Sequence, residues 1–553
     1  MLEISFKILL FVIEFIFAIA IIITFLVYIF PPKIKNKKSL EQKRIEISNN
    51  SFGFGKNWIR KNRNNLFEMY VEGNAYEIGY SAGKLTKELF EEQENIFINE
   101  LRNKVPNSFF RFILKIAIGI VNRKIAKHIG NEYCQEIYGI SKSASKKFFY
   151  LAPAYLRILN YHAAHDIGHA LQDKKYVGCT AFSVKNNLSE DGNLLIGRNF
   201  DFYINDDFCK DKIVAFYNPQ SGYKFAMVTW AGMIGVVSGM NVKGIAVTLN
   251  GAKSAIPKKS ATPVSIVARE ILQYASNLNE AIEIANKRTI FVSELIMVSS
   301  GSEKKSIIIE KTPFNTDVYD NNFDDVICTN HFQSQKLKDE KSNIDNITES
   351  STMYRYELVK ELLNEQCPLN AKKMANILRN NKGIGNANIG LGNEKTINQI
   401  IAHHSVIFIP EKLIMYVSSN PCNLGEYMAY DLNKVFKIAQ TGCPKNEIDE
   451  ISSVICCDDF LTNGNYKNYV EFKEILNKLN VGKINISDEN KIFDRLCELN
   501  PEFYLTYTSI GDFLFRKKRF SEAFAWYSKS LTKEFYHLIE KQKIEKLIVK
   551  CKV

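Results

Sequence analysis

The stretch GCTAFSVKNNLSEDGNLLIGRNFDF, residues 178–202, decides the fold prediction. It holds two short apolar runs joined by the turn signal EDGN at 190–193, a pattern typical of a β-hairpin. In an antiparallel pair, the far end of the second strand returns beside the start of the first. We therefore expect Arg198 and Asp201 to lie near Cys179.

These three residue types together indicate thiol chemistry. A cationic neighbour such as Arg198 lowers the pKa of a thiol and raises the thiolate fraction. A nearby carboxylate holds an amine or orients a base. Composition alone favours a plainer alternative, in which Cys179 is a buried cysteine beside an unrelated surface ion pair.

The sequence around this hairpin divides into a helical half and a β-rich half. From about residue 66 to 171, apolar residues recur at helical spacing. After residue 177 the pattern changes to short β runs, with turn signals at 218–222 and 241–244. A helical stretch at 264–287, more strands and further helices follow. Strand pairs alternating with helices in this order predict a layered α/β sandwich.

The hairpin resembles the opening block of N-terminal-nucleophile (Ntn) hydrolases of the choloylglycine hydrolase, acid ceramidase and N-acylethanolamine amidase type. Those families share a Cys-Thr opening strand and a Gly-Arg-Asn-x-Asp return strand, here Cys179-Thr180 and residues 197–201. The penicillin-biosynthesis acyltransferase branch is similar too, as are, more loosely, the phospholipase B-like proteins. EGNAYEIGYSAGKL at 72–85 resembles the opening of the acyltransferase pro-region helix.

Further blocks of the family pattern follow in the same order. GMNVKGIAVTLN ends at Asn250, where the family has an oxyanion-hole Asn, and CTNHF places Asn330 where a second Asn lies near the substrate. STMYRYE resembles the Ser-x-x-Arg region, with Arg355 near the site and Thr352 in place of Ser. Residues 405–420 resemble the closing strand pair.

The resemblance covers roughly residues 66–425 and implies an α/β fold, the four-layer αββα Ntn-hydrolase sandwich. One departure is a hairpin about three residues longer than in the amidases. If the extra residues lie in the turn at 186–191, the pairing survives; if they lie within a strand, the side chains change face and Arg198 points away.

The implied mechanism begins with self-cleavage between Gly178 and Cys179. The thiol attacks the Gly178 carbonyl, and water then releases residues 1–178. The freed α-amino group has a reference pKa near 8 and serves as general base. Asn250 is expected to stabilise the oxyanion, while Arg198 and Asp201 hold the amine and tune the thiol. The mechanism needs no metal and no cofactor.

The N-terminus is predicted to be a membrane anchor. Residues 8–30 are nearly continuously apolar, long enough to cross about 30 Å of hydrocarbon, with Glu14 as one interruption. A cleavable signal peptide is the alternative, but no A-x-A-like site follows. One Lys precedes the stretch, whereas the flank behind it is rich in Lys and Arg, so the positive-inside rule places the catalytic part on the cytoplasmic side.

Composition excludes several classes of protein. The net charge of +12 is spread along 553 residues, which does not indicate nucleic-acid binding. The eleven cysteines are scattered without a CxxC pair, so neither a disulfide framework nor a zinc site is expected. His162, His165 and His169 share one helical face with Asp166 nearby; packing and capping are preferred over metal binding or a role in self-cleavage.

The last part of the chain returns to helical periodicity. The stretch 504–531 resembles one tetratricopeptide repeat, with Gly511, Ala523 and Tyr527 near the spacing of its small and aromatic positions. The alternatives are a docking site for a protein partner and a helical cap on the catalytic part. The predicted organisation is an anchor at 1–30, a basic linker at 31–65, a helical pro-region at 66–178, a catalytic core at 179–425 and a helical extension at 426–553.

The sequence thus predicts a membrane-anchored cysteine Ntn amidohydrolase or acyltransferase that acts on a linear N-acyl amide, a small molecule or lipid-like. Two alternatives stay open. One is lipid ester hydrolysis, as in the phospholipase B-like relatives, and the other is an inactive anchored scaffold.

Overall fold

The computed structural model of the chain describes Glu14 and residues 28–34, 42–171, 178–253, 259–482 and 489–552. The predicted anchor at 8–30 lies outside these residues, apart from Glu14 and 28–30. Within the described part, no single helix has the length and hydropathy of a membrane span. The helices α3 (Lys87–Lys104) and α4 (Ser108–Asn122) meet that test only as a pair, which bends by 119°.

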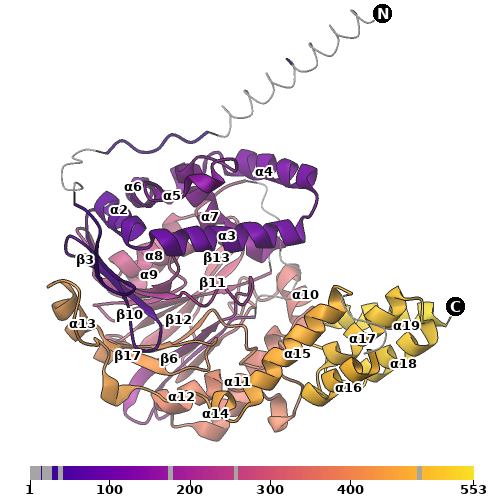
Figure 1. Cartoon of the computed structure of the whole chain (residues 1–553). Helices are drawn as coiled ribbons and strands as arrows, with labels where there is room; N and C mark the ends of the chain where they lie inside the picture. The colour runs from indigo at the N-terminus through magenta and orange to yellow at the C-terminus, as the bar shows by residue number, and fades with distance from the viewer. Residues whose placement is uncertain are drawn as a thin grey trace, which may run out of the picture.

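Two β-sheets form the centre of the described chain (Figure 1). Among the described residues, one sheet has eleven strands, in the order β1 (Ile45–Ser48), β2 (Ser51–Phe54), β3 (Asn57–Lys61), β4 (Phe67–Gly73), β7 (Ile213–Pro219), β8 (Phe225–Thr229), β9 (Ser238–Asn241), β10 (Ile245–Gly251), β11 (Glu294–Ser300), β12 (Lys305–Lys311) and β13 (Thr316–Tyr319). The other has six, in the order β14 (Asp325–Cys328), β5 (Thr180–Asn186), β6 (Gly192–Phe200), β15 (His404–Ile409), β16 (Ile414–Ser418) and β17 (Tyr427–Asp431).

The sheets pack face to face and helices cover their outer faces. In β10, Ala246 belongs to the core between the sheets, whereas Val247 belongs to the core under the helices. Side chains of a strand alternate between its two faces, so a strand buried on both sides is apolar throughout. The mixed α/β fold class predicted from the sequence is confirmed.

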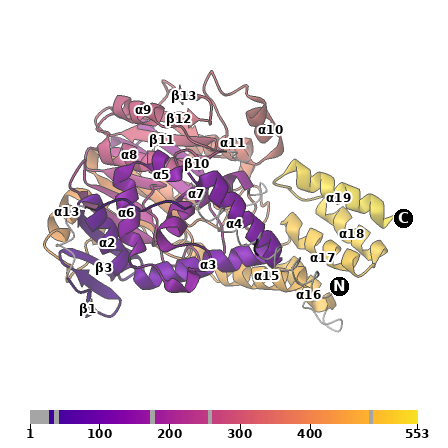
Figure 2. The same ribbon diagram turned by 90° about the horizontal axis from the view of Figure 1, so that it is seen from above.

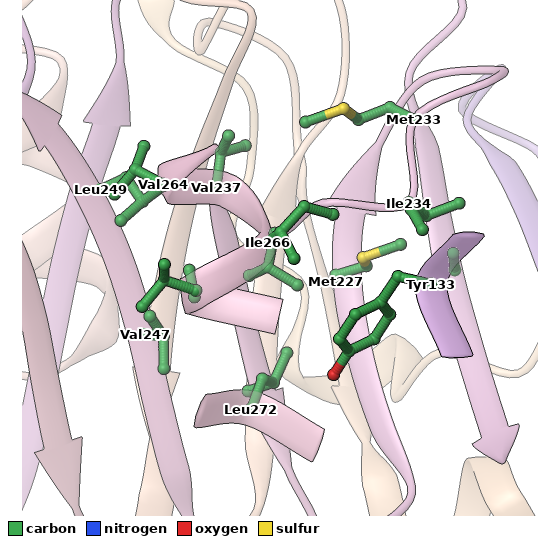
Figure 3. Close-up of a cluster of buried hydrophobic side chains, with 14 of the residues drawn as sticks. Tyr133, Met227, Met233, Ile234, Val237, Val247, Leu249, Val264, Ile266 and Leu272 are labelled. Carbon is green, nitrogen blue, oxygen red and sulfur yellow. The ribbon is translucent and has the colours of Figure 1, made fainter. Parts of the chain in front are cut away.

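The helical layers differ in size. The large sheet is covered by α2 (Ala75–Leu85), α3, α5 (Ile125–Ile129), α6 (Asn131–Ser141), α7 (Ala154–Leu171), α8 (Val264–Tyr274) and α9 (Leu278–Lys287). Beside the small sheet lie α10 (Lys341–Glu349), α11 (Thr352–Gln366) and α12 (Ala371–Leu378). Figure 3 shows how Ile266 and Leu272 of α8 meet Val247 of β10 in the core under the helices.

Helices α2 and α6 cross at a distance that only glycine permits. A Cβ at Gly79 would lie 1.9 Å from the carbonyl oxygen of Glu136, and one at Gly139 would lie 2.5 Å from that of Tyr76. Helix α2 begins with a capping box between Asn74 and Glu77. The glycines in the segment that resembles the acyltransferase pro-region therefore serve helix packing.

Three parts of the predicted organisation differ from the structure. The basic linker predicted at 31–65 contains strands β1 to β3, because aromatic residues such as Phe52, Phe54 and Trp58 provide a short period-2 pattern that packs on the sheet. The pro-region predicted to be helical contributes β4, which pairs in parallel with β7. The boundary at 426 also fails, because β17 completes the small sheet.

Most of the C-terminal helices form a group of their own at one side of the molecule (Figure 2). They are α14 (Asp459–Thr462), α15 (Asn465–Asn480), α16 (Glu489–Leu499), α17 (Tyr504–Arg516), α18 (Phe520–Ser530) and α19 (Leu538–Cys551), whereas α13 (Leu432–Ala439) lies at the opposite side and belongs to the core between the sheets. In the predicted repeat, α17 and α18 form a hairpin, and Gly511 lies against the ring of Tyr527. The core of this group includes Ile400 and Leu424, so it packs on the rest of the chain as the predicted cap would.

Candidate active site

Cys179 lies directly before β5, and the hairpin brings β6 back beside it. Residue Ala181 pairs with Arg198, and Thr180 pairs with Asn199. The turn between β5 and β6 takes up residues 187–191, and a register irregularity lies between Val184 and Asn186, away from the cysteine. The extra hairpin residues therefore leave the pairing at the site intact.

Arg198 contacts the sulfur of Cys179. Its Nη2 donates to Sγ over 3.7 Å and to the carbonyl of Leu249, while Nη1 donates to the hydroxyl of Ser238 at 2.6 Å. The guanidinium also lies over the ring of Phe200, 4.3 Å from its centroid. These contacts hold the fully buried guanidinium of Arg198 beside the thiol of Cys179.

The thiol of Cys179 is protonated at neutral pH in the uncleaved chain. Burial raises its pKa to about 11, and Arg198 opposes this rise while the carboxylate of Asp201 adds to it. A backbone hydrogen bond from Asp201 also favours the thiolate. A base is therefore required before this sulfur can attack a carbonyl.

Asp201 is a buried carboxyl group whose oxygens accept no hydrogen bond from the residues that the structure describes. Burial raises its pKa to about 7, against the opposing charges of Arg355 and Arg198. Ionising a buried carboxyl group without a hydrogen-bond partner costs free energy. Such a group is stabilised by a cation beside it or by binding a proton.

Arg355 holds the backbone on the other side of the cysteine. It lies in α11, and its Nη1 donates to the carbonyl of Cys179 at 2.6 Å and to the hydroxyl of Thr180 at 2.9 Å. Its Nη2 donates to Oδ1 of Asn330 at 2.7 Å. Thr352, which replaces the family's Ser, accepts from the backbone N–H of Asn330 at 2.8 Å, so the hydroxyl is used here as well.

The two asparagines connect neighbouring segments. Nδ2 of Asn250 donates to the carbonyls of Cys328 and Thr329 at 2.8 and 2.9 Å, and Nδ2 of Asn330 donates to that of Gly251 at 2.7 Å. Both hydrogens of the Asn250 amide are thus engaged, contrary to the free donor expected from the sequence. The oxyanion-binding role of Asn250 stays a prediction. It requires one of the two hydrogen bonds from Nδ2 to break, so that this donor can reach the substrate.

Three buried residues at the site were missed from the sequence. Nε2 of Gln399 donates to the carbonyl of Gly178 at 2.7 Å, at the predicted cleavage point. Ser238, which accepts from Arg198, also contacts Nε2 of His404 at 2.9 Å. Burial lowers the pKa of His404 well below its usual value, so this imidazole is neutral. Gln399 and Ser238 belong to no motif, and only tertiary packing brings them here.

Of the three histidines of α7 discussed above, the structure describes the side chain of His162 only. His162 is buried, its Nδ1 lies 2.8 Å from the carbonyl of Ile158, and its Nε2 accepts from the N–H of Ile234 at 3.0 Å. Burial lowers its pKa to about 4. Asp166 accepts from the N–H of Val264 at the start of α8. The side chains of His165 and His169 lie outside the described residues.

An apolar pocket opens beside the site. Phe90 and Phe97 of α3 line it together with Phe202 and Trp230, and Gln93, Glu94 and His162 are among its polar members. Phe202 directly follows Asp201 in the chain and stacks on Phe200 at 5.6 Å. The pocket therefore includes a chain neighbour of Asp201, although Cys179, Arg198 and Asp201 do not line it, and its wall is mostly apolar.

The central part of the chain is similar to a known protein family. Residues 188–417 match the family model described as acyl-coenzyme A:6-aminopenicillanic acid acyl-transferase. The matched segment, which is less than half of the chain, is similar to members of that family. The match confirms the resemblance to the Ntn acyltransferase branch, and it begins after Cys179.

Relatives of known sequence are distant. An uncharacterized protein of Archaeoglobus fulgidus is 26% identical over 263 residues, which are 45% of this chain and 44% of that protein. Protein dcd1B of Dictyostelium discoideum is 22% identical over 238 residues, which are 40% of this chain and 45% of that protein. The chain thus spans less than half the length of these two relatives.

Two solved structures are similar to part of the chain. The Caenorhabditis elegans ortholog of N-acylethanolamine-hydrolyzing acid amidase is 18% identical, with 42% of this chain and 93% of that chain covered and a TM-score of 0.31. A mutant of conjugated bile acid hydrolase from Clostridium perfringens is 16% identical, with 46% and 93% covered and a TM-score of 0.32.

Proposed function

We propose that the chain is a cysteine Ntn amidohydrolase or acyltransferase that acts on a linear N-acyl amide through a thioester. The observation that carries this proposal is the pairing of the buried Cys179 sulfur with Arg198, beside the unpaired carboxyl group of Asp201. The family match of residues 188–417 supports amide or acyl-transfer chemistry.

The first step is self-cleavage. Sγ of Cys179 attacks the carbonyl carbon of Gly178 and passes its proton to Asp201, whose pKa of about 7 suits a base at neutral pH. The charge on the carbonyl oxygen is met by the amide of Gln399. The Cys179 nitrogen then leaves with a proton from Asp201, and water hydrolyses the thioester, which releases the thiol and a carboxylate at Gly178.

The second phase is catalysis by the new chain end. The α-amino group of Cys179 takes the thiol proton, and the thiolate attacks the acyl carbon of the substrate. The resulting ammonium lies beside Asp201 and returns its proton to the leaving amine. Water or a second amine then resolves the thioester, which gives a hydrolase or a transferase respectively.

The acyl part of the substrate is assigned to the pocket beside the site. Phe90, Phe97, Phe202 and Trp230 offer an apolar wall. Burial of alkyl groups there contributes about 0.8 kcal/mol per CH₂. A lipid-like N-acyl amide fits this wall better than a polar one.

The N-terminal apolar stretch is proposed as an uncleaved anchor, with the catalytic part on the cytoplasmic side. The lysines behind residue 30 support this orientation. The helices at 504–551 are proposed mainly as a cap, since their core includes Ile400 and Leu424.

Denaturing electrophoresis with N-terminal sequencing tests the proposal. The wild-type protein is expected to give two fragments, one of which begins at Cys179, whereas Cys179→Ala gives one. Cys328→Ala is the matched control, because Cys328 is also a buried thiol near Arg198 and has no assigned role. An uncleaved wild-type chain with full activity would contradict self-cleavage, and activity retained in Cys179→Ala would exclude the thiol mechanism.

The same variants separate the alternatives. A phospholipase B-like enzyme would hydrolyse the ester analogue of a lipid and spare the N-acyl amide. An inactive scaffold would leave Cys179 unlabelled by an acyl probe that reacts with catalytic thiols. The proposed amidase is labelled, and the label is lost in Cys179→Ala but kept in Cys328→Ala.

A further inference from the structure

Helix α4 presents a row of large apolar side chains to solvent. Phe109, Phe110 and Phe112 are 64%, 62% and 54% exposed, and Ile113 and Ile120 are exposed as well. Residues 109, 113 and 120 are spaced by four and seven positions, so they share one face of the helix. We call these five side chains the α4 patch. A patch of this kind on a protein surface marks an interaction site.

Polar contacts attach α4 to the body of the protein on its other side. Among its residues, all of which the structure describes, only Asn122 is buried, and its Nδ2 donates to Oδ1 of Asn160 at 2.8 Å. Lys115 donates to the carbonyl of Tyr150 at 2.9 Å. Figure 1 shows α4 at the outer edge of the helical layer, on the side away from the small sheet. The patch therefore faces outward.

Positive charge surrounds this patch without any negative charge in the same segment. Between residues 101 and 131 the sequence has no Asp or Glu, and its cations are Arg102, Lys104, Arg111, Lys115, Arg123, Lys124 and Lys127. Arg123, Lys124 and Lys127 are exposed directly behind α4. A negatively charged surface is complementary to this arrangement.

The length of α4 decides how it would meet a lipid bilayer. Its 15 residues extend about 22 Å at 1.5 Å per residue, short of the about 30 Å of hydrocarbon in a bilayer. An amphipathic helix with an apolar face and cationic rim lies in the plane of the interface instead.

We propose that α4 docks in the plane of an anionic lipid leaflet. The α4 patch enters the boundary between headgroups and acyl chains, and Arg123, Lys124 and Lys127 contact lipid phosphates. Docking would hold α3, whose Phe90 and Phe97 line the apolar pocket, close to the bilayer.

Tryptophan fluorescence in the full-length protein tests this directly. Phe110→Trp is compared with Phe314→Trp, a control at a 92% exposed Phe in the loop between β12 and β13. Both are added to vesicles of phosphatidylcholine and phosphatidylserine that contain dibrominated lipid. The emission from position 110 is expected to shift to shorter wavelength and to be quenched severalfold more than that from 314. Equal quenching at the two positions would overturn the proposal, even if the N-terminal stretch tethers the protein.

The charge requirement has its own variant. Arg123→Glu, Lys124→Glu and Lys127→Glu, combined in the Phe110→Trp protein, are expected to abolish most of the quenching. The matched control reverses three exposed lysines of α19, Lys541, Lys543 and Lys546, and leaves the quenching unchanged. Undiminished quenching in the first variant would overturn the assignment of an anionic leaflet. Circular dichroism checks that both variants fold.

Discussion

At the scale of single residues, the site contains charged groups that are already buried in the uncleaved chain. Arg198 and Arg355 lie on either side of Cys179, while the carboxyl group of Asp201 has no hydrogen-bond partner among the described residues. The α-ammonium formed by cleavage would supply the missing partner. Self-cleavage would therefore complete the electrostatic environment of the site as well as expose its base.

The carboxyl group of Asp201 makes the precursor sensitive to pH. The folded-state pKa of this carboxyl group, about 7, lies above its ordinary value of 3.8, so the native chain binds the proton more tightly than the unfolded chain. The stabilisation is present at low pH and is lost as pH rises from about 4 to about 7, on the order of 4 kcal/mol. In Cys179→Ala, the added substitution Asp201→Asn is expected to stabilise the protein more at about pH 8 than at about pH 5.

Denaturant unfolding at the two pH values measures this difference. The paired design cancels the titration of other buried acids, such as Glu68 and Glu136, since both proteins share them. An effect of Asp201→Asn that is equal at both pH values would contradict the raised pKa.

The amide of Gln399 is predicted to accelerate self-cleavage. Loss of one donor to a developing oxyanion costs about 3 kcal/mol, so Gln399→Met is expected to slow cleavage by about 100-fold. Gln273→Met is the matched control, because Gln273 is also a buried glutamine whose Nε2 donates to a backbone carbonyl, that of Ser221, at 2.9 Å. The appearance of the Cys179 fragment over time gives the rate, and equal rates in the two variants would remove Gln399 from this step.

At the scale of elements, the sequence predicts those strands whose alternation and turn signals lie within one short stretch of chain. The hairpin of β5 and β6 follows from its alternation and turn signal, and its register places Ala181 opposite Arg198 as the antiparallel geometry requires. Strands β1 to β3 were missed because each is only four or five residues long and lies in a charged stretch. Gln399 and Ser238 could not be predicted, since they reach the site from loops and strands distant in sequence.

Strand β4 is expected to keep the two chains together after cleavage. It precedes the cleavage point and pairs with β7 from Phe67 opposite Ile213 to Gly73 opposite Pro219. The buried pair of Glu136 and Arg269, 3.1 Å apart, also connects the two sides. Under native conditions, size-exclusion chromatography should show one species that contains both fragments. Separation of the fragments without denaturant would contradict the shared sheet.

At the scale of the whole molecule, the structure joins a layered α/β body to a C-terminal helical layer and an outer helical edge. The C-terminal layer is attached through contacts such as Asn393 to the carbonyl of Glu534 and Lys473 to Asp206. The outer edge of the helical layer over the large sheet carries α4 with its apolar and cationic surface (Figure 1).

The central claim is that the catalytic sulfur belongs to a chain end. Mass spectrometry of the purified protein after brief reaction with an N-acyl amide tests it most directly. The account predicts a fragment whose first residue is Cys179, with the acyl group attached to its sulfur and absent from Cys328. An acylated chain in which the bond between Gly178 and Cys179 is intact, or acylation elsewhere, would contradict it.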